Sequence, residues 1–343
     1  MTDTTAASAQ TIKQRSIKQQ VKQRLSSVVI VSTSPDALNS NTAIRDYVAD
    51  GFAEAFEEAA LAKCPIEVAA DVVADRKPEL VLAVGSIAVD SVDFYPLRKA
   101  CDRVGSYLAF WLHDDPYEFD YAEKINGIAD MIFTNDAWAL EHYDHPNVWH
   151  LPMAGSRKVH YRPIEPNQTR DITAFFCGVA YANRVSFFRQ ASKLLSEHRT
   201  VVNGALWPSD LTFAQNIRLS PYQLADYAAN SLLTFNIGRN FNIANRRFNI
   251  TPSTPGPRTF EVALAGCAQL FLLDSLEIEK YFDSDTEIIL FDSISDIKAV
   301  FERMNDEPEW LINIAIASQN RALKEHCYKH RAETIFERVS GYL

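Results

Sequence analysis

The stretch TPGPRTFEVALAGCAQLFLLD, residues 254–274, decides the fold of the second half of the chain. Two prolines around a glycine precede a helix-forming segment, which leads through Gly266 into the apolar run 268–274. A helix that leads into a continuous apolar strand is typical of a parallel sheet whose two faces are covered by helices. Arg258 and Glu261 are the only charged residues of the helical segment, so we expect the others to pack against the sheet.

The same alternation of apolar strands and helical segments extends in both directions from this stretch. Upstream, strands are predicted at 26–33, 78–86, 106–116, 130–136 and 147–153, with helices at 43–62, 93–104 and 137–143. In the second half, strands are predicted at 171–178, 200–204, 232–238, 268–274 and 287–292, with helices at 182–198, 220–229 and 276–282.

A polar segment with two prolines, residues 154–170, separates the two series and predicts a hinge. The sequence therefore predicts an α/β protein with two parallel-sheet halves, residues 26–153 and 171–343. The second half ends in a helical tail from residue 295.

Composition limits the class of protein. The chain has 343 residues, of which 47% are hydrophobic and 23% charged, which is typical of a globular protein with two domains. No apolar run approaches the roughly 20 residues of a membrane span, and the N-terminus lacks the apolar core of a secretory signal. Five scattered cysteines without a CxxC pair argue against a disulfide framework or zinc site, so we expect a cytoplasmic protein.

Charge is distributed unevenly. The net charge of −10 argues against bulk nucleic acid as a partner. Residues 1–25 carry five basic side chains against the single acid Asp3 and form a predicted basic N-terminal arm. We interpret this arm as a solvated, frayed segment; the alternative is electrostatic attachment to an acidic membrane or partner surface.

Polar residues that end apolar strands are the first candidates for a site, because ligands bind at the carboxyl ends of parallel strands. His113, Asp114 and Asp115 follow one such strand, and their carboxylates suit a general base, a sugar-hydroxyl contact or a cation. A solvated turn with an aspartate cap explains the same residues equally well. Residues 134–136 end the next strand, and we interpret them as a helix cap.

Two further strand ends carry possible phosphate ligands. Gly178 follows a strand and Arg184 lies early in the next helix, where glycine permits close approach and a helix N-terminus attracts anions. No GxGxxG motif is present, so dinucleotide binding gains no support. The other strand end is rich in arginines that, together with Thr259, predict a pyrophosphate clamp, with simple surface charge as the alternative: Arg239, Arg246, Arg247 and Arg258. Glu261, one turn into the helix, can accept hydrogen bonds from both hydroxyls of a ribose.

The ordered set TNDAWALEHY, DITAFFCG, LSPYQLADYAANSLLTFNIGR and RTFEVALAGCAQLFLLD resembles the CgeB-like glycosyltransferases, a family of the wider retaining group with the GT-B fold. This resemblance covers roughly residue 106 to the C-terminus. It implies two Rossmann-like domains that face a cleft, and sugar transfer from a nucleotide diphosphate sugar, with a UDP-sugar favoured. The acceptor is left open between a glycan, a protein and a small molecule.

The resemblance also assigns roles. Glu261 matches the ribose-binding glutamate, Arg258 and Arg184 match positions near the donor phosphates, and Asp115 falls at the turn that faces the reacting sugar. Many relatives have a second glutamate eight positions before the ribose-binding one, whereas this chain has Ser253. Fixed arginines and a helix end can stabilise the leaving diphosphate, so no cofactor is required and a divalent cation is optional.

Other functions use the same residue types. A regulatory protein that binds a nucleotide or sugar without converting it needs the same arginine and glutamate contacts. A nucleotide-sugar epimerase of the same fold acts without an acceptor. An NAD-dependent oxidoreductase is disfavoured because both halves lack the glycine fingerprint.

Overall fold

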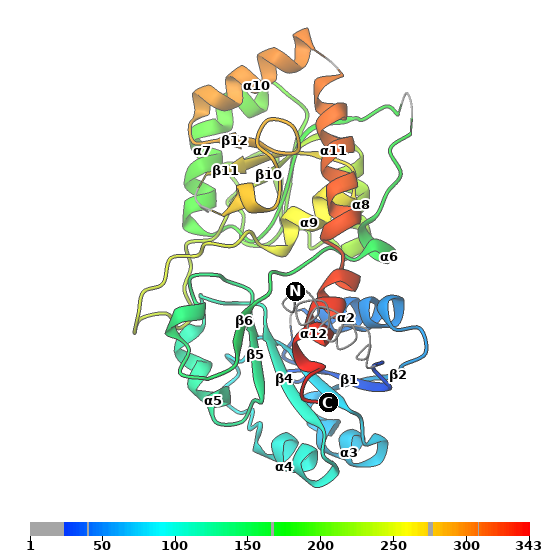
Figure 1. The fold of residues 1–343 in the computed structure, drawn as a ribbon. Helices are drawn as coiled ribbons and strands as arrows, with labels where there is room; N and C mark the ends of the chain where they lie inside the picture. The colour runs from blue at the N-terminus through cyan, green and yellow to red at the C-terminus, as the bar shows by residue number, and fades with distance from the viewer. Residues whose placement is uncertain (1–23, 40, 166–167, 274–276, 308) are drawn as a thin grey trace, which may run out of the picture.

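The computed structural model describes residues 24–39, 41–165, 168–273, 277–307 and 309–343. Two six-stranded sheets, one from each half of the chain, form two domains that lie one above the other in Figure 1. All strand pairs within both sheets are parallel, as predicted. The predicted basic arm falls almost entirely outside the described residues.

The first sheet has the order β2-β1-β3-β4-β5-β6. Its strands are β1 (Ser27–Ser32), β2 (Ala60–Pro65), β3 (Leu80–Gly85), β4 (Tyr107–Leu112), β5 (Met131–Thr134) and β6 (Val148–His150). Successive side chains of β1 alternate between two cores, with Val28 and Ile30 on one face and Val29 and Val31 on the other. This double burial is the reason for the continuous apolar run in the sequence.

The helical elements of this domain pack on both faces of the sheet. They are α2 (Thr42–Ala55), α3 (Ile66–Arg76), α4 (Tyr95–Val104), η1 (Phe119–Ala122), α5 (Glu123–Asn126) and η2 (Leu140–His142).

Two expectations for this domain were wrong. The helix expected at 43–62 ends at Ala55, and the chain then forms the edge strand β2. Ala60, Leu61 and Lys63 of this edge strand are exposed, and three of its six residues are alanine or lysine, so it gives no strand signal in the sequence. The helix expected at 137–143 is only the short 3₁₀ turn η2.

The second sheet has the order β12-β11-β10-β7-β8-β9. Its strands are β7 (Ile172–Cys177), β8 (Thr200–Asn203), β9 (Ala214–Gln215), β10 (Ser231–Asn236), β11 (Ala268–Leu272) and β12 (Ile289–Phe291). The helical elements after β6 are α6 (Arg157–His160), α7 (Ala182–Ser196), α8 (Pro221–Ala229), α9 (Pro257–Leu264), η3 (Ile278–Lys280), α10 (Ile294–Asp306), α11 (Trp310–Glu325) and α12 (Tyr328–Val339).

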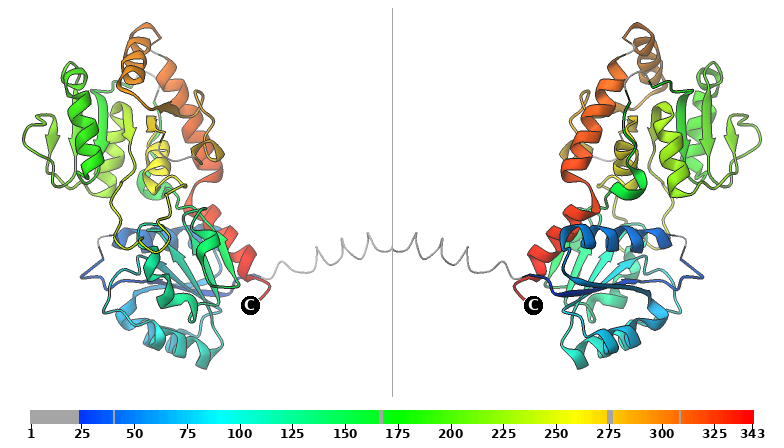
Figure 2. Two further views of the ribbon diagram at one scale, coloured as in Figure 1. Left: turned by 90° about the vertical axis from the view of Figure 1, so that its left-hand side faces the viewer. Right: turned by 90° about the vertical axis from the view of Figure 1, so that its right-hand side faces the viewer.

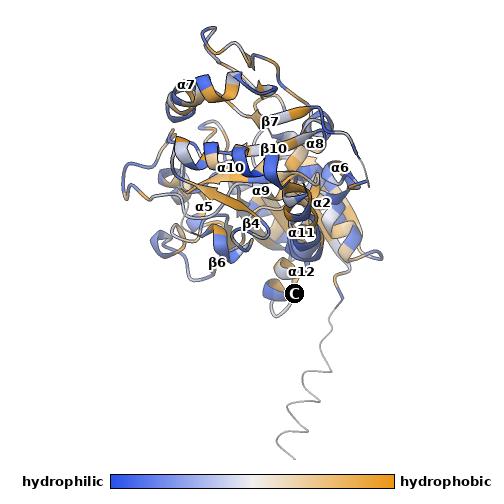
Figure 3. Ribbon diagram, turned by 90° about the horizontal axis from the view of Figure 1, so that it is seen from above, coloured by the Kyte–Doolittle hydropathy of each residue, from blue (hydrophilic) through white to orange (hydrophobic). Residues whose placement is uncertain are grey.

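The helix α9 is the predicted helix of the opening stretch. Proline occupies its first position, where a missing N–H is harmless, and no side chain caps its N-terminus. Phe260, Val262 and Leu264 are fully buried, which accounts for the apolar composition beyond the first turn. Figure 3 shows the contrast between buried and exposed elements across the molecule: strand β4 is coloured hydrophobic, whereas much of helix α10 is hydrophilic.

The last helix, α12, departs from the predicted domain division. Although it follows the second sheet in sequence, it packs against α2 of the first domain, and Tyr328 and Ile335 belong to that domain's core. A Cβ at Gly51 of α2 would lie 2.6 Å from the Tyr328 backbone carbon, so only glycine permits this close packing. Figure 2 shows α12 beside α2, below the body of the second domain.

Two segments that cross between the domains are bonded to each other. The Gly155 N–H donates to the His326 carbonyl at 3.0 Å, and the Tyr328 N–H donates to the Gly155 carbonyl at 3.3 Å. The buried Arg331 guanidinium donates to the carbonyls of Pro152 and Met153. Two segments therefore connect the domains side by side: the predicted hinge and the junction of α11 and α12.

Candidate functional site

The strand order of the second sheet reverses between β7 and β10, where connections leave in opposite directions. Such a switch point is the usual ligand site of an open α/β sheet. Gly178 follows β7 and Arg239 lies just after β10, so both predicted residues lie at this point. The start of α9 is close to it, because the Arg258 and Glu261 charges both act on the Cys177 thiol.

Arg258 and Glu261 form an ion pair across the first turn of α9, with 2.7 Å between Nη1 and Oε2. The Glu261 side chain is only 12% exposed, whereas that of Arg258 is 36% exposed. The carboxylate is therefore fixed, while the arginine reaches solvent beside it. The structure brings these two predicted residues together at an uncapped helix N-terminus, which attracts anions.

His160, a residue that the sequence analysis missed, completes the surroundings of Glu261. Its Nε2 lies 3.7 Å from Glu261 Oε1, and its ring packs edge-on against Tyr47 of the first domain. Burial lowers the pKa of His160, although the Glu261 charge opposes that change, so the ring is neutral at pH 7. The only sequence signal was a histidine in a polar linker, which carries no periodicity.

Arg184 bonds to backbone carbonyls and so has a structural role. Its guanidinium donates to the carbonyls of Val179, Ile237 and Gly238 and so ties the segment after β7 to the segment after β10. Burial, together with the charges of Arg239 and Arg258, lowers the pKa of Arg184 to about 10.

Gly178 and Thr259 are also held in packing contacts. A Cβ at Gly178 would lie 2.9 Å from Arg184 Nη1 and 3.0 Å from the Phe176 ring. Thr259 is fully buried, and its hydroxyl accepts from Asn236 Nδ2 at 2.7 Å. Both residues therefore support the site through packing and hydrogen-bond contacts.

Arg239 joins the two domains. Its guanidinium forms a 2.7 Å ion pair with Asp114 and lies over the Tyr117 ring, 3.9 Å from its centroid. Burial opposes the charge of Arg239, but the Asp114 carboxylate together with Tyr117 and Tyr181 outweighs it and raises the arginine pKa. The predicted residues of the two halves, Asp114 and Arg239, are thus brought together by the tertiary structure.

Arg247 lies apart from this group. Its guanidinium pairs with Glu123 of the first domain, and its backbone N–H donates to Asp120. The neighbouring Arg246 N–H also donates to Asp120. The loop that carries both residues descends onto the first domain (Figure 2), so the structure does not place Arg247 with Arg258.

Asp115 is placed differently from the expectation. Its side chain is buried, and Oδ2 accepts from Thr134 Oγ1 at 2.7 Å and from the Tyr143 hydroxyl at 2.5 Å. Burial raises its pKa to about 6, although these two hydrogen bonds oppose the change. The carboxylate therefore lies inside the first domain, whereas the resemblance implied a position facing the sugar.

His113 lies at the same strand end and contacts the segment between β1 and α2. Its Nε2 is 3.3 Å from Asn41 Nδ2 and 3.8 Å from the Asp114 carboxylate. Its Nδ1 is buried and has no hydrogen-bond partner among the described residues. Asn41 and Asp114 thus orient the ring through Nε2, and Nδ1 is available for a further hydrogen bond.

A helix cap is expected at residues 134–136, but only a turn that leads into η2 follows them; Asp136 caps that turn and also joins the domains. Its Oδ1 accepts from the N–H groups of Trp138 and Ala139. Its Oδ2 accepts from the N–H groups of Ser253 and Thr254 at 2.7 and 3.1 Å. The position where many relatives carry a second glutamate is therefore used here to hold the segment before α9.

Glu118 is a second residue that the sequence analysis missed. It is fully buried, and its carboxylate accepts from Ser86 Oγ and from the Ile87 N–H. Burial and the nearby Asp114 charge raise its pKa to about 8, well above its usual 4.5. A single acid within an otherwise unremarkable turn gives no sequence signal for such burial.

Glu118→Gln is expected to flatten the pH dependence of stability. A carboxyl whose pKa is raised on folding binds its proton more tightly in the native state, so the unfolding free energy falls as pH rises between about 4.5 and 8. The substitution removes a loss on the order of 3 kcal/mol at pH 8. Thermal unfolding at pH 5 and pH 8 measures it: the variant should gain several degrees over the native protein at pH 8 only. The exposed Glu337→Gln is the control, and an equal gain at both pH values would contradict the assignment.

Among the residues that the structure describes, no three His, Cys, Asp or Glu side chains are grouped so that they could share a metal ion. Within the same residues, no helix has the length and apolar character needed to cross a bilayer.

Comparison with known proteins supports the class of the protein. Residues 184–337 match the family model described as Glycosyl transferase-like. The structure is similar to that of HepE from Anabaena, solved with UDP and glucose, with a TM-score of 0.61 at 10% identity over 92% of this chain and 99% of that one. No curated protein sequence matches the chain significantly.

Two further solved structures are similar. An alpha-glucosyltransferase solved with UDP and mismatched DNA has a TM-score of 0.59 at 12% identity, over 90% of this chain and 99% of that one. Sucrose-phosphate synthase from Thermosynechococcus elongatus has a TM-score of 0.56 at 8% identity, over 91% and 98%.

At these identities the structures establish the fold, which is the GT-B architecture of two Rossmann-like domains. The family match over residues 184–337, together with this fold, supports a glycosyltransferase as the class of the protein.

Proposed function

We propose that the protein transfers a sugar from a nucleotide diphosphate sugar, with a UDP-sugar as favoured donor, to a glycan, protein or small-molecule acceptor. The proposal includes retention of the anomeric configuration and membership of the CgeB-like group. The observation that carries it is the enclosed Glu261 carboxylate beside Arg258 at the uncapped start of α9, at the switch point of the second sheet. HepE and the alpha-glucosyltransferase, which share the fold, were both solved with UDP.

Glu261 is suited to hold the ribose. An ionised carboxylate accepts hydrogen bonds from two neighbouring hydroxyls, and His160 and Tyr47 restrict its orientation. Because the carboxylate is nearly enclosed, these hydrogen bonds would be shielded from water and strengthened.

Arg258 is suited to the diphosphate. The bond between the sugar C1 and the β-phosphate oxygen breaks in the reaction, and the electron pair leaves with the nucleotide diphosphate. The exposed guanidinium and the N–H groups of the first turn of α9 would stabilise that negative charge. A divalent cation is not required by this arrangement.

On the opposite domain, His113 and Asp114 are the proposed contacts of the donor sugar. Asp114 is held by Arg239, and His113 has an uncommitted Nδ1. An ionised carboxylate near the sugar also stabilises positive charge that develops at C1.

We further propose a cytoplasmic location, with the basic arm as an optional contact to acidic membranes.

A panel of nucleotides tests the donor class. UDP at about 100 times its Kd should stabilise the protein by about 2.7 kcal/mol and raise Tm, whereas ADP, GDP, CDP and NAD should not. Thermal shift at matched concentrations is the measurement. Stabilisation by NAD or by none of the nucleotides would contradict the proposal. Conversion of one UDP-sugar into another without acceptor would instead establish an epimerase.

A further inference from the structure

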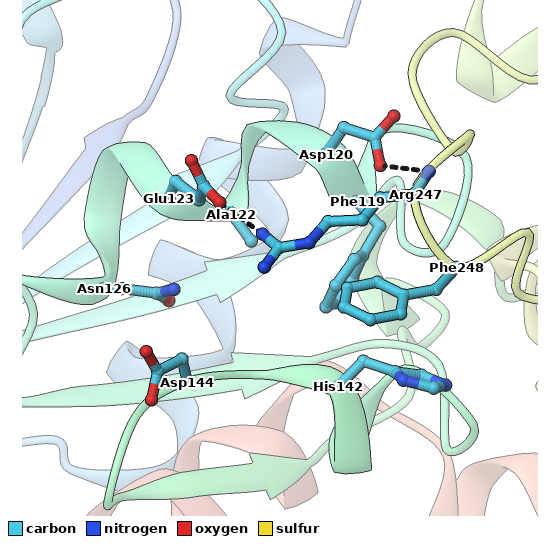
Figure 4. A pocket seen from close by; sticks show the side chains of 9 residues that line it. All are labelled: Phe119, Asp120, Ala122, Glu123, Asn126, His142, Asp144, Arg247 and Phe248. Carbon is cyan, nitrogen blue, oxygen red and sulfur yellow. Dashed lines mark hydrogen bonds and ion pairs between the residues drawn. The ribbon is translucent and has the colours of Figure 1, made fainter.

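A cavity of about 250 Å³ lies away from Arg258 and Glu261, where the loop before α9 meets the first domain. Nine residues line it: Phe119, Asp120, Ala122, Glu123, Asn126, His142, Asp144, Arg247 and Phe248 (Figure 4). Seven come from η1, α5 and η2 and their flanking residues, and two come from the loop. The cavity therefore exists only because this loop of the second domain folds back onto the first.

Aromatic rings form one wall of the cavity. The His142 and Phe248 rings are stacked, with centroids 4.7 Å apart and an interplanar angle of 26°. Phe119 meets Phe248 edge-on at 5.8 Å. Phe248 is 40% exposed, although burial against a neighbour is the usual state of such a large apolar side chain.

Polar groups form the opposite wall. Figure 4 shows Asn126, Asp144 and the Arg247 guanidinium around the open side of the cavity, facing the rings. The Asn126 Oδ1 is buried and has no hydrogen-bond partner among the described residues. An unpaired buried amide oxygen costs free energy, which a ligand hydroxyl would recover.

We propose that this cavity binds a saccharide, as the acceptor or an extension of it, and thus deepens the proposed transferase function on which it rests. A sugar ring has an apolar face of C–H groups and an edge of hydroxyls. The aromatic wall matches the face, and the carboxylate, amide and guanidinium groups match the hydroxyls. The cavity volume of about 250 Å³ lies just below the usual range of ligand pockets and accommodates one sugar residue.

The charge of the lining selects among saccharides. Three carboxylates, Asp120, Glu123 and Asp144, face one guanidinium, Arg247, which is already paired with Glu123. Negative charge in the ligand is therefore repelled. Neutral hexoses and amino sugars fit, whereas uronic acids and sulfated sugars do not.

A glycan array that carries neutral, amino and anionic oligosaccharides tests this proposal on the full-length protein. The native protein should bind neutral or amino glycans, and Phe248→Ala should lower that binding at least tenfold. Ile243→Ala is the matched control, because Ile243 lies in the same loop with 41% exposure but does not line the cavity. Asp144→Asn, an exposed substitution that leaves the loop contacts intact, should weaken amino glycans more than neutral ones.

Binding of anionic glycans only, or equal loss in Phe248→Ala and Ile243→Ala, overturns the proposal, as does the absence of glycan binding by the native protein. Hydrolysis of UDP-glucose without acceptor separates this outcome from failure of the transferase proposal. The Phe248→Ala variant should retain that hydrolysis and its UDP-induced thermal shift, because Phe248 packs against Phe119 and His142 of the first domain. If the native protein neither hydrolyses a UDP-sugar nor responds to UDP, the transferase proposal fails, whatever the array shows.

Discussion

Replacing Arg258 by alanine is expected to lower kcat for sugar transfer roughly 100- to 1000-fold, with a much smaller change in donor KM. The reason is that a positive group aimed at the leaving diphosphate acts mainly when charge develops there, and loss of one such group costs about that factor. Initial rates over a range of UDP-sugar concentrations separate the two constants. Arg258→Lys should recover part of the rate, because it keeps the charge but loses the bidentate geometry.

Stability should fall modestly in this variant. The arginine is 36% exposed, but Glu261 is only 12% exposed, so loss of its ion-pair partner leaves an enclosed carboxylate and costs about 1–3 kcal/mol. Arg189→Ala is the matched control, because Arg189 forms an equally short ion pair with Asp210 on the same domain but lies on α7, away from the switch point. A kcat for Arg258→Ala within threefold of that control would show that Arg258 has no part in catalysis.

Replacing Glu261 by alanine is expected to raise donor KM and the Kd for UDP by at least about 100-fold. Two hydrogen bonds from ribose hydroxyls to a carboxylate are lost, each worth about 1.5–3 kcal/mol. Isothermal titration with UDP and with 2′-deoxy-UDP makes the measurement specific. The native protein should prefer UDP, and Glu261→Ala should bind the two nucleotides equally, because the coupling between the carboxylate and the 2′-hydroxyl is then absent.

Glu302→Gln on α10 is the control, since Glu302 forms an exposed pair with Lys298 and lies far along the chain from α9. If the Glu261→Ala variant keeps the preference for UDP over 2′-deoxy-UDP, the Glu261 carboxylate does not bind the ribose. The role of Arg258 would then need a separate explanation.

The fold was largely predictable because burial of a parallel strand is written into consecutive residues. Val28 to Val31 are apolar on both faces since each face of the first sheet is covered by helices. The strand β2 escaped prediction because half of its six residues are exposed at the edge of the sheet. The position of α12 escaped prediction for another reason: its apolar face indicates burial but not the domain against which it is buried.

The site was predictable in part. Strand ends and a helix start can be found from the sequence, and Gly178, Arg239, Arg258 and Glu261 indeed lie at the switch point of the second sheet. The sequence could not place Asp115 inside the domain, because a buried and a solvated aspartate look the same in a sequence. The catalytic and binding roles of the predicted site residues stay predictions.

By itself, the sequence determined two parallel-sheet domains and the helix start that carries Arg258 and Glu261, because strand burial and helix geometry depend on residues close together in the chain. Only the tertiary structure decided which side chains meet. Asp114 pairs with Arg239 across 125 residues, Glu261 meets His160, and Arg247 leaves the predicted clamp for Glu123. Such pairings depend on how long loops cross between the domains, and a charged side chain on a loop carries no local pattern that names its distant partner.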